Sequence, residues 1–157
     1  MNSATSSLER LTPSGLGKRL TPARVRRFAL LYARVAIGAA FLSAVASRFG
    51  LWDGSLDLDH FPKFLAYTGQ VNSFMPAFTI PFLAWAATIA ELSLGISLVL
   101  GIRVRWTALG AASLLFLFGT AMAISFGLKE PLDYSVFSAS AGALLLALLY
   151  APRGEAA

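Results

Sequence analysis

The chain contains no cysteine, a single histidine and few charged residues. Without cysteine it can form no disulfide, thiol relay or cysteine-ligated iron–sulfur cluster. The histidine, His60, lies in a polar stretch and has only Asp59 as an adjacent candidate ligand. We therefore expect neither an intrinsic haem nor a metal site.

Charge is also scarce, because only 13% of the residues are charged and 57% are hydrophobic. Soluble domains are typically about a quarter charged and roughly 45–50% apolar. The composition therefore predicts an integral membrane protein whose main partner is the lipid bilayer. The net charge of +5 comes from basic residues beside apolar segments, which does not indicate nucleic-acid binding.

Four apolar segments have the roughly 17–25 residues that a membrane-spanning helix needs; they cover residues 28–51, 78–100, 106–126 and 134–150. The predicted fold is an all-α, integral membrane four-helix bundle over residues 28–150. Residues 1–27 are predicted to be a disordered basic tail, and residues 151–157 a short second tail. In the connection after the first segment, Asp59 is the expected N-cap of a short helix on the outer membrane surface.

The distribution of charge predicts the orientation of the bundle. The flank before the first segment is basic, the next connection carries three aspartates, and the following turn holds Arg103 and Arg105. The positive-inside rule then places both termini in the cytoplasm of a multi-pass inner-membrane protein. Residues 24–47 also have the outline of a cleaved signal peptide, but Arg34 within their apolar part argues against cleavage.

Arg34 and Glu91 are the charges inside apolar segments, where a charged side chain costs at least about 2.5–3.5 kcal/mol. Counted from the segment ends, their depths differ by roughly 6 Å, so we expect an Arg34–Glu91 ion pair. The pair has two interpretations. It is either a lock that fixes helix register, or a catalytic site in which Glu91 accepts a proton and Arg34 binds an anion or carbonyl.

Helical spacing places these charges on faces rich in small residues; the faces are Ala84, Thr88, Glu91 and Gly95, then Arg34, Gly38, Phe41, Val45 and Arg48, and finally Ser135, Ser138 and Gly142. Arg48 is expected either to extend to lipid head groups or to pair with Asp133. Arg48, Thr88 and Tyr134 are the candidates for binding a cofactor.

Three stretches resemble the DoxX family of small bacterial four-helix membrane proteins; they are "YARVAIGAAFLSAVASRFG", "IPFLAWAATIAELSLGISLVLGIRVRWTALGA" and "ISFGLKEPLDYSVFSASAGALLL". Many members carry a glycine and lysine pattern at the end of the first span, where this chain has Ala46, Ser47 and Arg48. Some relatives are membrane subunits of a thiosulfate–quinone oxidoreductase. The resemblance implies a contact with membrane quinone and a protein partner in a redox complex.

Three functions follow from these observations. The first is an accessory membrane subunit of a quinone-linked redox complex, which is at most part of an enzyme. The second is a non-catalytic scaffold or assembly protein in which the arginine–glutamate pair is structural. The third is a proton-coupled small-molecule exporter that uses Glu91, although small multidrug exporters carry their essential carboxylate in the first span.

Overall fold

The computed structural model describes residues 21–54 and 56–150, and within these ranges every regular element is a helix. The α-helices are α1 (Pro22–Arg48), α2 (Phe61–Val71), α3 (Ile80–Leu100), α4 (Val104–Phe126), α5 (Lys129–Asp133) and α6 (Val136–Leu149). Short 3₁₀ turns lie at Leu51–Asp53, Leu58–His60 and Ala77–Thr79. The predicted all-helical class is confirmed for the described residues.

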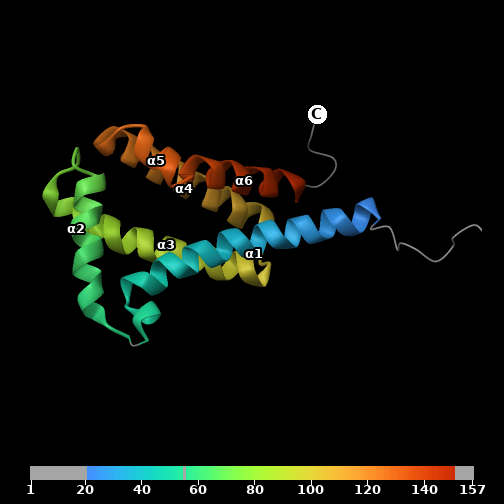
Figure 1. Cartoon of the computed structure of the whole chain (residues 1–157), viewed down its shortest axis with the longest axis horizontal. Coiled ribbons are helices and arrows are strands. Elements are labelled where there is room, and N and C mark those ends of the chain that lie inside the picture. Colours follow the sequence, from blue (N-terminus) through green and yellow to red (C-terminus); the bar gives the residue numbers. More distant parts are fainter. Residues whose placement is uncertain (1–20, 55, 151–157) are drawn as a thin grey trace, which may run out of the picture.

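The long helices form two closely packed pairs, α1 with α3 and α4 with α6 (Figure 1). Small residues permit this packing. A Cβ atom added to Gly38 on α1 would lie 2.9 Å from the carbonyl oxygen of Gly95 on α3. Alanines likewise permit close packing of α4 against α6, where Ala108, Ala111 and Ala143 are fully buried. Backbone approach of this kind is how helices associate inside a bilayer, where the hydrophobic effect does not drive them together.

Three helices are long and apolar enough to cross a membrane, by length and composition; they comprise Pro22–Arg48, Ala77–Leu100 and Val104–Phe126. Large apolar side chains cover their outer surfaces, including Phe82, Ile89 and Leu117, which are 75%, 60% and 62% exposed. Water would penalise so much exposed apolar surface, whereas lipid would not. The chain is therefore a membrane protein.

The expected fourth span at residues 134–150 is a shorter helix, because α6 has only 14 residues. Ser135 separates it from α5 by adopting a left-handed backbone conformation with φ of 55°. That conformation is uncommon for residues other than glycine and stops a right-handed helix. Three candidate spans are found among the described residues, and a fourth crossing by residues 134–150 remains a prediction.

The start of the first helix differs from the one expected. Helix α1 begins at Pro22, so residues 22–27, assigned to the disordered tail, are helical. Proline at the first helical position explains this start, because its missing N–H and fixed φ suit a helix N-terminus. Residues 1–20 and 151–157, which make up the rest of the predicted tails, lie outside the described residues.

The connection between α1 and α3 contains the predicted short helix, α2, which runs across the ends of α1 and α3 (Figure 1). The expected cap is wrong, because the side chain of Asp57, and not that of Asp59, accepts a backbone hydrogen bond at the start of the preceding 3₁₀ turn. Thr68 and Val71 on α2 are buried. Helix α2 is thus packed against the bundle through one face, which brings it over the polar residues described next.

Candidate functional site

The most deeply buried charge of the described residues is Glu91, whose side chain is 2% exposed. It lies in the middle of α3, and its partner is Arg48, the last residue of α1. Nη2 of Arg48 donates to both carboxylate oxygens, at 2.7 and 2.8 Å. Charge-assisted hydrogen bonds of this length are among the strongest that side chains form.

Thr88 and Phe64 complete the surroundings of the arginine. Nη1 of Arg48 donates to Oγ1 of Thr88 at 3.0 Å, and that hydroxyl donates to the carbonyl of Ala84 at 2.8 Å. From α2, the ring of Phe64 lies over the guanidinium, with its centroid 3.7 Å from Cζ. The four residues Arg48, Phe64, Thr88 and Glu91 are called the arginine–glutamate cluster below. It joins α1, α2 and α3 through one guanidinium.

Aromatic side chains hold α2 in the position that places Phe64. The ring of Phe61 lies between those of Phe49 and Trp85, at centroid distances of 5.9 and 4.5 Å. Phe61 also contacts Phe64, at 5.9 Å. These rings fix the start of α2 to the end of α1 and to the first half of α3. The aromatic cover over the ion pair is therefore built into the connection and does not depend on one contact.

The expected ion pair between Arg34 and Glu91 is wrong. Side chains on a helix tilt toward its N-terminus, so in the antiparallel helices α1 and α3 Arg34 points away from Glu91 while Arg48 points toward it. The side chain of Arg34 instead packs on Gly101, where an added Cβ would lie 3.0 Å from the guanidinium carbon. The Nε atom of Arg34 is buried there without a hydrogen-bond partner.

Of the three predicted cofactor-binding candidates, two lie in the cluster and one does not. Thr88 and Arg48, named as candidates for cofactor binding, are part of the cluster. Tyr134 is 69% exposed and lies near Tyr67 on α2. Burial raises the pKa of Tyr67, and the nearby Tyr134 and Glu130 raise it further. Tyr134 therefore lies at the end of α5 near α2 and not at the ion pair.

Neither expectation for Arg48 holds. Its side chain is 9% exposed, so it does not extend to the membrane surface. The alternative partner, Asp133, forms an ion pair with Lys129 four residues earlier on α5. Arg48 does lie at the end of α1, as the sequence predicted, but its side chain turns into the interior instead of toward the membrane surface.

The helix faces were predicted more accurately than the pairs. The buried residues of α3 are Ala84, Thr88, Glu91, Gly95 and Leu98, and those of α1 are Gly38, Phe41, Val45 and Arg48. The stripe expected at Ser135, Ser138 and Gly142 is wrong, because both serines are exposed. The buried serine of α6 is Ser140, which donates to the carbonyl of Ala112 on α4 at 2.8 Å.

A family model of DoxX matches residues 29–126, which is more than half of the chain. The chain belongs to the DoxX family. The matched region contains the whole arginine–glutamate cluster and ends with α4, so the cluster lies within the DoxX domain. Comparisons with curated proteins and with solved structures find no match.

Proposed function

We propose that this DoxX protein is a non-catalytic membrane subunit in which the arginine–glutamate cluster locks three helices together. The observation that carries the proposal is the saturation of Glu91. Both of its carboxylate oxygens accept from Arg48, and its side chain is almost fully buried. A proton acceptor needs a carboxylate oxygen within reach of the proton that it takes. A structural lock instead needs both oxygens bonded to its partner, as those of Glu91 are to Arg48.

The location of the pair supports the same function. A lone charge inside a membrane protein is strongly unfavourable, and pairing with hydrogen bonds to the remaining atoms removes most of that cost. Here Arg48 satisfies Glu91, Thr88 accepts from Arg48, and Phe64 covers the guanidinium. The cluster thus favours one register of α1 against α3 and one position of α2.

The assembly that we propose for this subunit is a quinone-linked redox complex. Membership of the DoxX family supports it, together with the lack of cysteine and of a haem-ready histidine, which requires a partner to supply the redox centre. Proton-coupled export is less favoured, since an exporter must release and take up protons at its carboxylate, and Glu91 is held by Arg48.

The experiment is a double replacement that removes both charges, Arg48→Met with Glu91→Leu. Buried ion pairs replaced together by apolar residues of similar volume often leave stability unchanged or raised, whereas removal of one partner costs about 3–5 kcal/mol. We expect each single variant to lose abundance in the membrane and the double variant to recover it. Electron flow to quinone in membranes that contain the redox partners should recover as well.

A folded double variant without electron flow would overturn the lock and move the chemistry to Glu91. The matched control is Lys129→Met with Asp133→Leu, which removes an exposed ion pair on α5. Surface pairs contribute about 0–1 kcal/mol, so neither single variant of the control should lower abundance.

A further inference from the structure

Arginines collect at the end of the bundle opposite the cluster. Six arginines lie on the first half of α1, in the turn between α3 and α4 or at the start of α4; they are Arg24, Arg26, Arg27, Arg34, Arg103 and Arg105. The acidic residues that the structure describes are all elsewhere, in the connection between α1 and α2, on α5 or at Glu91. This end is therefore strongly positive, whereas elsewhere basic and acidic side chains are mixed.

Four of these arginines line two pockets that share Tyr150, at the end of α6. The first pocket, of about 520 Å³, is lined by Arg26, Arg27, Leu30, Leu149 and Tyr150. The second, of about 470 Å³, is lined by Gly101, Arg103, Val104, Arg105, Trp106 and Tyr150. Each pocket therefore presents two arginines beside an aromatic ring. Together they are called the arginine pockets below.

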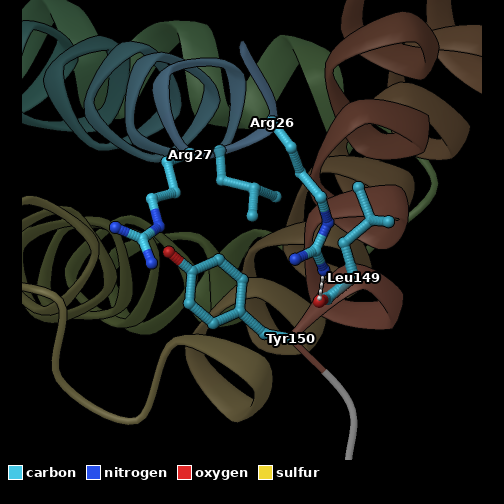
Figure 2. Close-up of a pocket in the computed structure, with 5 residues that line it drawn as sticks. Arg26, Arg27, Leu149 and Tyr150 are labelled. Atoms are coloured by element: carbon cyan, nitrogen blue, oxygen red, sulfur yellow. Dashed lines mark hydrogen bonds between the residues drawn. The ribbon is translucent and has the colours of Figure 1, made fainter. Parts of the chain in front are cut away.

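Figure 2 shows the geometry of the first pocket. The guanidinium of Arg27 and the hydroxyl of Tyr150 point toward one another on one side. On the other side Arg26 donates to the carbonyl of Leu149 at 3.1 Å, which ties the start of α1 to the end of α6. That bond fixes the position of Arg26. The pocket is thus shaped by contacts that exist without any ligand.

Beside the second pocket, one donor lacks an acceptor. Arg34 packs against Gly101, which lines this pocket, and its Nε atom is buried without a hydrogen-bond partner. Buried donors are normally paired, and an unpaired one costs about 1–3 kcal/mol. The guanidinium of Arg34 therefore adds a positive charge beside the second pocket. An anion bound there would offset the charge of Arg34 even without a direct contact.

Exposed apolar side chains adjoin the same pockets. Phe28, Leu149 and Trp106 are 71%, 51% and 66% exposed, and the ring of Trp106 lies under the guanidinium of Arg105 at 5.4 Å. Tryptophan and tyrosine gather at the level of lipid head groups, with apolar surface on the acyl side. A ligand that offers both a phosphate and acyl chains fits this surface better than a free anion.

We propose that the arginine pockets bind the head group of an anionic phospholipid that carries two phosphates, one in each pocket on either side of Tyr150. Basic pockets between membrane helices on the cytoplasmic side are typical sites for cardiolipin-like head groups. A diphosphate lipid would also hold α1, the α3–α4 turn and α6 together at this end. The proposal does not depend on the function of the arginine–glutamate cluster, which lies at the other end of α1.

The test is native mass spectrometry of the full chain in mild detergent, with added cardiolipin, phosphatidylglycerol or phosphatidylcholine. Cardiolipin should remain bound at the lowest concentration, followed by phosphatidylglycerol and then phosphatidylcholine. Arg27→Gln with Arg103→Gln removes one arginine from each pocket. A basic residue near an anionic lipid surface contributes about 1 kcal/mol to binding. Removal of each arginine should therefore weaken cardiolipin binding about fivefold.

The control, Arg24→Gln with Lys63→Gln, removes the same total charge from positions that do not line the pockets. Its cardiolipin binding should match that of the unaltered chain. Equal losses in the two double variants would overturn the site in favour of a non-specific charge effect. Retention of phosphatidylglycerol equal to that of cardiolipin would overturn the two-phosphate head group. Displacement of the lipid by millimolar inorganic phosphate would assign the pockets to a free anion.

Discussion

Arg34 and Arg48 lie on the same face of α1, four turns of helix apart, yet only Arg48 meets Glu91. The two arginines therefore belong to different ends of the protein. Arg48 forms the internal ion pair beneath Phe64, and Arg34 lies at the positive end against Gly101. This separation gives a direct test of which charge matters for folding.

Loss of the Arg48 charge should destabilise the protein, while loss of the Arg34 charge should not. Arg48→Met leaves Glu91 buried without a partner, so we expect a loss of about 3–5 kcal/mol in the free energy of unfolding. Arg34→Met removes a guanidinium that has an unpaired buried donor, and its cost should be below about 1 kcal/mol. Unfolding of the purified variants in detergent, followed by circular dichroism, measures both. A larger loss for Arg34→Met would contradict the pairing described.

The ring of Phe64 should stabilise the protein through its cation–π contact with Arg48 and not only through the apolar volume that it fills. Phe64→Tyr keeps an aromatic face over Arg48, whereas Phe64→Leu removes it and keeps a similar apolar volume. A desolvated cation–π contact contributes up to about 2 kcal/mol, so the leucine variant should lose between about 0.5 and 2 kcal/mol more than the tyrosine variant. Both are measured by the same unfolding experiment. In the background Arg48→Met this difference should disappear, because no cation remains under the ring.

The close approach of Gly38 to Gly95 should tolerate no side chain. A Cβ on Gly38 would meet both the backbone oxygen of Gly95 and the side chain of Val99 at 2.9 Å. We expect Gly38→Val to separate α1 from α3, with a loss of about 1–3 kcal/mol or more. The control is Gly142→Ala on α6, where an added Cβ has no neighbour within 4 Å. That variant should be neutral or slightly more stable, since alanine favours a helix over glycine by about 1 kcal/mol.

The helix faces could be predicted from the sequence because the 3.6-residue period is a property of the helix alone. Gly38, Phe41, Val45 and Arg48 share one face wherever α1 begins. The pairing of Arg34 with Glu91 could not be predicted from depth, because depth counted from segment ends ignores side-chain direction. The Gly38–Gly95 contact sets the register, and the tilt of helical side chains then selects Arg48. The available signal was that Arg48 shares the small-residue face of Gly38 on α1.

The short fourth helix illustrates a different limit. Nothing in the apolar run of residues 134–150 indicates that Ser135 adopts a positive φ, since serine rarely does so. Tertiary packing sets the backbone at the start of α6. The ring of Phe137 packs on Gly119 of α4, so that a Cβ added to Gly119 would lie 2.8 Å from that ring. The buried face of α6 shifted accordingly to Ser140, whose hydroxyl bonds to Ala112.

Whether α5 and α6 together cross the membrane can be decided by labelling, because the chain has no native cysteine. Single cysteines at Asp57, Arg105, Lys129 and Ala156 would report on the two outer connections, the α3–α4 turn and the C-terminal segment. In intact cells, a membrane-impermeant maleimide should label Asp57→Cys and Lys129→Cys but neither Arg105→Cys nor Ala156→Cys. This pattern follows from the positive-inside rule, which places the arginine-rich end in the cytoplasm.

After lysis all four should react. Labelling of Ala156→Cys in intact cells would mean that the chain crosses the membrane three times and that α6, at 14 residues, returns to the side from which α5 began.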